Sequence, residues 1–133
     1  MGLFGLSLAG DVGRVIGVET DSSACADFRH NARGLDHVEL AEGPVEEVLN
    51  RLEGESDLLV LDPPRSGAGR EVIAGIERLA PGRIAYVSCD PATLARDARS
   101  LTDAGYQLRE VQPLDLFPQT YHVESVALFV RKR

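Results

Sequence analysis

The segment RIAYVSCDPATLARD, residues 83–97, joins a predicted strand directly to a predicted helix. Its first six residues form a mostly apolar run of the kind found in buried strands. Asp90 suits the N-cap of the following helix and Pro91 suits its first turn, because the first amide groups of a helix lack partners within the helix. Cys89 is therefore expected just before a helix N-terminus, where the positive end of the helix dipole favours a nucleophilic thiolate.

The same alternation of apolar strands and helical segments extends over the rest of the chain. It is typical of an α/β domain built on a largely parallel sheet. Strands are expected at residues 14–19, 37–41, 57–61, 83–88, 107–112 and 124–131. Apolar residues at helical spacing predict helices around residues 25–32, 45–52, 72–79 and 94–104. No helical segment separates the last two strands, so we expect the last strand to run antiparallel.

The N-terminal segment GLFGLSLA, residues 2–9, reads as a helix that follows Met1 directly. In an open parallel sheet such a helix comes after a strand and a turn, and ligands bind outside the carboxyl ends of the strands. We therefore expect the sheet of this chain to lack its first strand.

Length and composition indicate one folded domain, residues 1–133, of ordinary globular composition. The net charge of −7 makes the chain poorly suited, by itself, to neutralising nucleic-acid phosphates. Cys25 and Cys89 lack the spacing of a metal site, and two free thiols suit a reducing cytoplasm. No stretch approaches the ~20 apolar residues of a membrane span. We expect a cytoplasmic protein that binds no metal and no membrane.

Two acidic residues end predicted strands where a ligand would bind. Glu19 closes the strand in VIGVET, residues 15–20, and such a carboxylate can accept the hydroxyl groups of a ribose. Asp62 follows an apolar strand and precedes two prolines, which stop the strand and stiffen the loop. The alternatives are a solvent-facing glutamate at residue 19 and a helix-capping role for Asp62.

The C-terminal stretch FPQTYHVESVALFV, residues 117–130, places Glu124 at the start of a strongly apolar strand. A carboxylate there is a candidate proton acceptor, and the alternative is a solvated glutamate at a strand end. Cys25 lies in helical phase with Phe28, so it is expected to be an inert core residue.

Together these segments resemble a known family. Glu19, DPPRSG (62–67), SCDPATLARD (88–97) and LDLFPQTYHVES (114–125) are similar to the catalytic domain of the RNA uracil-5-methyltransferases. These enzymes act on ribosomal and transfer RNA and use S-adenosylmethionine. The resemblance runs from Gly2 to the C-terminus and implies a Rossmann-like class I methyltransferase sheet.

The resemblance also implies roles for individual residues. Cys89 matches the nucleophile that adds to carbon 6 of uracil, and Glu124 matches the base that removes the proton from carbon 5. The residues that match S-adenosylmethionine-binding positions are Gly2, Leu3, Glu19, Gly43 and Asp62. Covalent addition suits the chemistry, because carbon 5 of uracil alone is too weak a nucleophile to attack a sulfonium at a useful rate.

The chain lacks the N-terminal RNA-binding barrel usual in that family. The resemblance therefore implies that RNA is held mostly by parts not present here. We expect the chain alone to bind S-adenosylmethionine weakly and to methylate poorly. Without its first strand the sheet would have an unpaired edge, and we expect this edge to favour self-association.

Three other functions remain open from the sequence. A methyltransferase acting on exocyclic amino groups also carries Asp-Pro-Pro, but usually with an aromatic residue next, where this chain has Arg65. A cysteine hydrolase could use Cys89, His122 and Asp115 as a triad. A non-catalytic fragment that binds or oligomerises is the third alternative.

Overall fold

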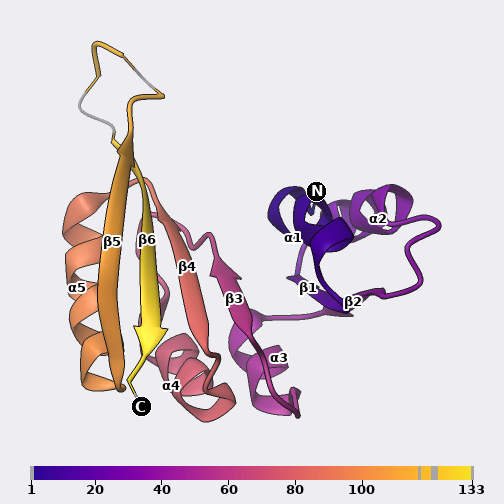
Figure 1. Ribbon diagram of the computed structural model, residues 1–133. Coiled ribbons are helices and arrows are strands. Elements are labelled where there is room, and N and C mark those ends of the chain that lie inside the picture. The colour runs from indigo at the N-terminus through magenta and orange to yellow at the C-terminus, as the bar shows by residue number, and fades with distance from the viewer. Residues whose placement is uncertain (1, 117, 121–122, 133) are drawn as a thin grey trace. The chain divides into compact units, whose positions relative to one another are not determined.

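The computed structural model describes residues 2–116, 118–120 and 123–132, and the chain divides into two compact units. The first unit is Met1–Leu52 and the second is Glu53–Arg133. The six strands pair in two groups, two strands in the first unit and four in the second (Figure 1). The sequence predicted all six strands, whereas their division between two sheets emerges only from the structure.

The first unit contains two parallel strands and its own helices. Its elements are α1 (Leu3–Leu8), the 3₁₀-helix η1 (Ala9–Asp11), β1 (Val15–Glu19), α2 (Ser22–Asn31), β2 (Val38–Glu42) and α3 (Val45–Arg51). Strand β1 pairs with β2 from Val15 opposite Val38 onward. Cys25 is 1% exposed, as expected of a core residue. Phe28 packs so closely on β1 that a Cβ at Gly17 would lie 2.5 Å from its ring, which explains the glycine in this strand.

The second unit is a four-stranded mixed sheet. Its elements are β3 (Leu58–Leu61), α4 (Gly69–Leu79), β4 (Arg83–Ser88), α5 (Pro91–Asp103), β5 (Tyr106–Leu114) and β6 (Glu124–Arg131). The strand order is β3-β4-β6-β5. Strands β3 and β4 are parallel, and β6 runs antiparallel to both of its neighbours. The predicted antiparallel direction of the last strand is confirmed.

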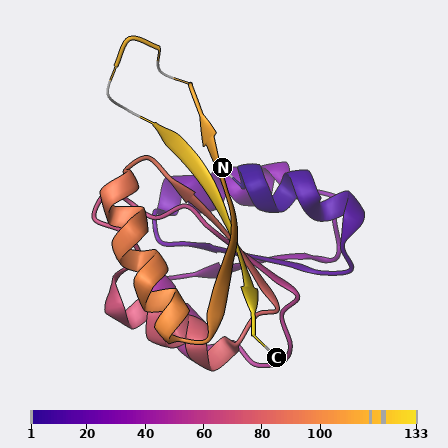
Figure 2. The ribbon, with the colours of Figure 1, turned by 60° about the vertical axis from the view of Figure 1, so that its left-hand side comes forward.

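The core of the second unit lies between this sheet and helices α4 and α5, which cover one of its faces (Figure 2). Alternate residues of β4 and β6 are buried there, because successive side chains of a strand point to opposite faces. The buried set comprises Ile84, Tyr86, Ser88, Ser125, Ala127 and Phe129. Ser88 lies opposite Ser125 and Tyr86 opposite Ala127, so the two strands bury the same face in register. Among the described residues, no helix is long and apolar enough to span a bilayer.

Candidate active site

The junction of β4 and α5 has the form that the sequence predicted. Strand β4 ends at Ser88, and α5 begins at Pro91 with Asp90 as its N-cap. The Oδ1 atom of Asp90 accepts a hydrogen bond from the Thr93 amide at 2.7 Å. The Ser88 hydroxyl donates to the Asp90 carbonyl at 3.0 Å and so closes the turn around Cys89. The Cys89 thiol is free and half-buried, one residue before the helix cap.

The cap gives stability a pH dependence, because the hydrogen bond from the Thr93 amide lowers the pKa of Asp90. A carboxyl whose folded-state pKa is lowered stabilises the fold above its unfolded value, about 3.9, and loses that contribution as the pH falls through the folded value. Asparagine can also cap a helix, but it carries no charge and does not titrate. We expect the wild type to be more stable than Asp90→Asn at pH 7, and the difference to vanish in acid, as measured by urea unfolding at several pH values. An equal difference in acid would contradict this.

Glu124 is the first residue of β6 and pairs with Leu114 of β5. On its other side, β6 pairs with β4 up to Ser125 opposite Ser88. Cys89 and Glu124 lie one step further along the same antiparallel register. The pairing itself ends at Ser88 and Ser125, and Cys89 lies in the turn between β4 and α5. The register therefore brings the candidate nucleophile and the candidate base to adjoining strand ends.

Asp62 follows β3 at the same edge of this sheet. Strand β3 is parallel to β4, with Leu61 opposite Tyr86, so the carboxyl ends of the two strands lie together. The Asp62 side chain lies near the surface, yet the surrounding protein partly desolvates its carboxyl and raises its pKa. The alternative of a helix cap is wrong for α4, whose N-cap is Ala68.

The remaining site candidates lie in the first unit. Glu19 ends β1, and its Oε1 atom accepts hydrogen bonds from the amides of Thr20 at 2.8 Å and Asp21 at 2.9 Å. Gly43 follows β2 with a φ of 136°, and its amide donates to the Glu19 carbonyl at 2.9 Å. The structure therefore brings Glu19 and Gly43 together at the carboxyl ends of β1 and β2.

Gly2 and Leu3 lie at the start of α1. Gly2 is the N-cap with a φ of 85°, and a Cβ there would lie 2.7 Å from Leu6 and 2.8 Å from Phe28. Only glycine fits this position without strain. Leu3 is 73% exposed.

The site candidates thus form two sets. Cys89, Asp62 and Glu124 share one sheet edge of the second unit, whereas the other candidates belong to the first unit. His122 of the hydrolase alternative lies outside the described residues. Within the described part of the chain, no group of three or more His, Cys, Asp or Glu could hold a metal ion.

Sequence reasoning missed Asp97. This residue lies on the buried face of α5 and hydrogen-bonds to the loop that follows β3. A signal was present, because Asp97 falls between Leu94 and Leu101 at the helical spacing of core residues. A carboxylate at such a position needs several partners, which here are the adjacent Arg96 and, from other segments, Ala68 and Tyr86.

Comparison with solved structures gives the class of protein. The precorrin-6Y C5,15-methyltransferase of Geobacter metallireducens matches 90% of this chain and 69% of its own length with a TM-score of 0.69. At 19% identity that likeness shows the fold alone. The fold is the Rossmann-like α/β fold of methyltransferases, as the sequence predicted. The tRNA (uracil-54, C5)-methyltransferase of Pyrococcus abyssi, solved with S-adenosyl-L-homocysteine, matches 97% of this chain and 32% of its own, with a TM-score of 0.82 and 34% identity.

Comparison of sequences gives the family. The model of the tRNA (uracil-5-)-methyltransferase family matches residues 1–132, so the chain belongs to this family. An uncharacterized RNA methyltransferase of Streptomyces coelicolor is 49% identical over 96% of this chain and 29% of its own length. One of Thermotoga maritima is 44% identical over 98% of this chain and 30% of its own. The chain therefore spans about three tenths of these relatives, and the resemblance stated above is confirmed.

Proposed function

We propose that this chain is the catalytic domain of an RNA methyltransferase that transfers a methyl group from S-adenosylmethionine to carbon 5 of a uridine in ribosomal or transfer RNA. The observation that carries the proposal is the register of β4 and β6. It sets Cys89 and Glu124 on adjoining strand ends, with Cys89 next to the N-terminus of α5. A thiol and a carboxylate in that relation supply the nucleophile and the base that substitution at carbon 5 requires.

The reaction divides into steps that these two residues can perform. The Cys89 thiolate adds to carbon 6, and the electron pair of the carbon 5–carbon 6 bond moves so that carbon 5 becomes nucleophilic. S-adenosylmethionine, when bound, would supply an electrophilic methyl group to carbon 5 and leave as S-adenosylhomocysteine. Glu124 then accepts the proton from carbon 5, and the bond between carbon 6 and the Cys89 sulfur breaks as the double bond forms again. The thiolate is thereby regenerated.

The residues of the first unit fit a nucleoside cofactor. Two backbone amides hold Oε1 of Glu19, which fixes its carboxylate at the end of β1, where the hydroxyl groups of a ribose can be recognised. Gly43 adjoins it without a side chain, so a flat adenine can approach the backbone closely. The Pyrococcus abyssi relative was solved with S-adenosyl-L-homocysteine, which supports S-adenosylmethionine as the methyl donor.

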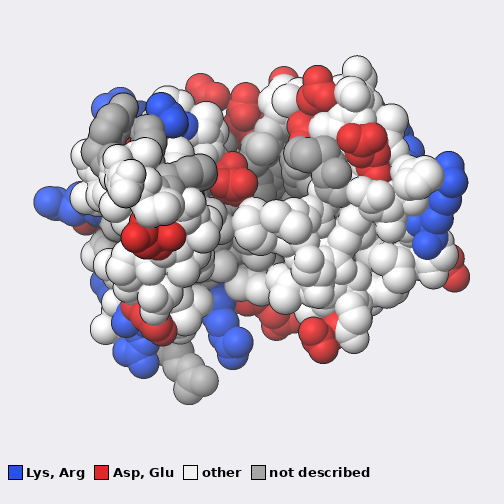
Figure 3. Space-filling model, turned by 90° about the horizontal axis from the view of Figure 1, so that it is seen from above, with Lys and Arg blue, Asp and Glu red and all other residues white. Residues whose placement is uncertain are grey.

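The RNA substrate must present an unstacked base. Enzymes that modify a base in place take it out of the stack, and sequence-specific RNA recognition favours loops and bulges. The chain carries a net charge of −7, and basic side chains on the face in Figure 3 lie in separate groups among acidic ones. We therefore propose that most phosphate contacts come from sequence outside this chain, which spans only about three tenths of its relatives.

The test is covalent capture of RNA that contains 5-fluorouridine. Fluorine at carbon 5 cannot leave as a proton does, so the adduct persists. We expect a complex that survives denaturation, depends on S-adenosylmethionine and maps to Cys89 by peptide mass spectrometry. The chain should be tested alone and joined to the N-terminal region of the Streptomyces coelicolor relative. An amino-group methyltransferase would give methylated RNA without any adduct, and that result would refute the proposal.

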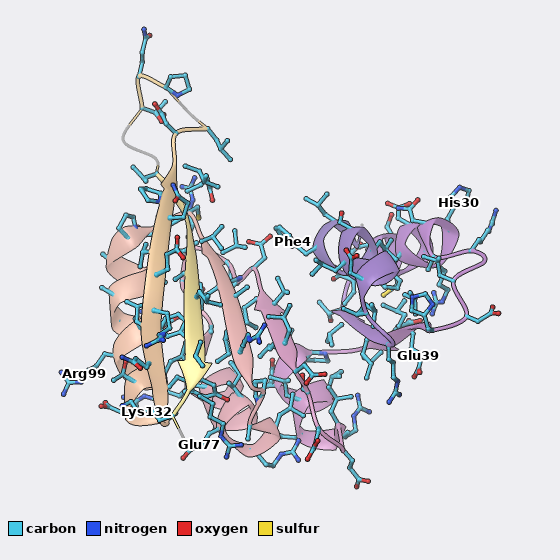
Figure 4. The ribbon with its side chains drawn as sticks, in the orientation of Figure 1. Phe4, His30, Glu39, Glu77, Arg99 and Lys132 are labelled. Atoms are coloured by element: carbon cyan, nitrogen blue, oxygen red, sulfur yellow. The ribbon has the colours of Figure 1, made fainter. Side chains whose placement is uncertain are left out.

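Cofactor binding provides an independent prediction at Glu19. The variant Glu19→Gln keeps an oxygen for the Thr20 and Asp21 amides but loses the charge. Hydrogen bonds to charged groups contribute about 1.5–3 kcal/mol, so the Kd for S-adenosylmethionine should rise about 10- to 100-fold by calorimetry. The control is Glu39→Gln, whose carboxylate pairs with Arg14 on the surface of the same unit (Figure 4). Equal Kd values for wild type and Glu19→Gln would exclude the ribose role.

A further inference from the structure

The loop between β3 and α4, residues 62–68, is hydrogen-bonded to α5 through the buried side chain of Asp97. Asp97 is 3% exposed. Its Oδ2 atom accepts hydrogen bonds from the Ala68 amide at 2.7 Å and from the Tyr86 hydroxyl at 2.6 Å. One carboxylate oxygen therefore joins the end of the loop to strand β4 and to α5.

The neighbouring residue of α5 extends this network. Arg96 donates to Oδ1 of Asp97 through Nε at 3.1 Å and Nη2 at 3.0 Å. The same Nη2 atom donates to the Ser66 carbonyl at 2.6 Å. One turn earlier, the Thr93 hydroxyl donates to the Arg65 carbonyl at 3.0 Å. The first turns of α5 thus bind the loop at three of its residues, Arg65, Ser66 and Ala68.

Close packing accompanies these hydrogen bonds. Gly67 is buried with a φ of 89°, and a Cβ there would lie 2.5 Å from Oδ2 of Asp97 and 2.7 Å from Thr93. No side chain fits between the loop and the helix. Burial and the bond to Asp97 raise the pKa of Tyr86, so its hydroxyl remains a donor at neutral pH. The carboxylate is supplied with donors as a buried charge requires.

We propose that Asp97 is a positioning residue of the active site, which holds the loop that carries Asp62 and Arg65 at a fixed place relative to Cys89. The inference rests on the proposed function. Helix α5 begins just after Cys89, and its buried face binds the loop, so one rigid element sets the relative position of both. Misplacement of a reacting group by about 1 Å can cost on the order of 10²-fold in rate.

The variant Asp97→Asn tests this role. Asparagine keeps the size of the side chain but carries no charge. It offers one acceptor oxygen, whereas the donors around Asp97 are divided between two. We expect the amides of residues 65–69 to exchange hydrogen faster, while core amides such as those of Phe129 and Leu101 remain protected. We expect kcat for methylation and the rate of adduct formation with 5-fluorouridine RNA to fall about 10²-fold, the scale of a misplaced reacting group. The KM for RNA should change less than the kcat.

The matched control is Asp103→Asn on the same helix. Asp103 pairs with Arg99 on the exposed side of α5, and Figure 4 shows Arg99 pointing away from the sheet. This variant should leave both the exchange of residues 65–69 and the rate of adduct formation unchanged. Should Asp97→Asn fail to fold, Tyr86→Phe removes one donor to the same Oδ2 atom and keeps the charge. It should give smaller changes in the same direction.

Three results would overturn the positioning role. The first is equal amide exchange of residues 65–69 in the wild type and in Asp97→Asn. The second is faster exchange in Asp97→Asn that is spread evenly over the core. The third is faster exchange of residues 65–69 with an unchanged kcat. Amide exchange does not depend on activity, so it separates this inference from the proposed function. A wild type that forms no adduct, both alone and joined to the N-terminal region of the Streptomyces coelicolor relative, refutes the proposed function. Even then, slow amide exchange of residues 65–69 in the wild type and fast exchange in Asp97→Asn would support the attachment of the loop by Asp97.

Discussion

Replacement of Cys89 by serine is expected to abolish covalent capture of 5-fluorouridine RNA and to lower methyl transfer by on the order of 10⁴-fold or more, the scale at which enzymes lose turnover without their nucleophile. A thiolate adds readily to carbon 6 at neutral pH, whereas a serine hydroxyl stays protonated there and is a much weaker nucleophile. The substitution is nearly isosteric, so the turn between β4 and α5 should persist. Methylation is measured by transfer of radiolabel from S-adenosylmethionine to RNA.

The other thiol of the chain provides the control for this prediction. Cys25 is buried in the first unit, so Cys25→Ala should lower stability yet still form the adduct with RNA. Residual methylation in Cys89→Ser near the wild-type rate would show that carbon 5 is activated without this thiol. In that case the proposed chemistry would be wrong even though the family assignment would stand.

The second large effect is expected at Glu124. Removal of a general base typically costs about 10²- to 10⁴-fold, and we expect Glu124→Gln to lower turnover within that range. The position of the block is diagnostic. Addition of Cys89 and methylation of carbon 5 should still occur, but the proton at carbon 5 should remain. A covalent complex that already carries the methyl group should therefore accumulate on ordinary uridine RNA, and its mass can be measured on the Cys89 peptide.

A matched carboxylate on the neighbouring strand serves as the control. Glu110 is exposed on β5, and Glu110→Gln should turn over at the wild-type rate. If Glu124→Gln turned over like Glu110→Gln, another group would have to accept the proton. If Glu124→Gln instead formed no complex at all, Glu124 would act before or during addition of the thiol.

Several elements of the second unit could be predicted from the sequence. Strands β4 and β6 have the predicted bounds. Both are apolar runs flanked by charged or helix-capping residues. Asp90 and Pro91 predicted the start of α5 because capping is a local property of the chain. The positions of Cys89 and Glu124 followed from these bounds, and that of Asp62 from the end of β3 at Leu61.

Other features depend on contacts that the sequence does not reveal. Strand β5 runs from Tyr106 to Leu114, longer than predicted, because its exposed residues and its irregular pairing near Leu108 obscure the alternation. Helix α4 begins at Gly69, earlier than predicted, and has no side-chain cap to mark its start. The partner of Asp97 in the loop, Ala68, lies 29 residues away, so the role of Asp97 could not be inferred from local pattern. The roles of the cofactor-binding candidates and of Cys89 and Glu124 remain predictions.

The place of β6 in the sheet bears on when catalytic competence arises during folding. β6 follows β5 in the chain, yet it lies between β4 and β5, so β5 has no neighbour to join until β6 is in place. The pairing of β4 with β6 is non-local, because α5 and β5 lie between them in the chain. Such pairings form slowly, since the entropy of closing a long loop opposes them. If Cys89 and Glu124 act as proposed, a nascent polypeptide still short of β6 would carry the thiol without its proton acceptor and could not complete a catalytic cycle.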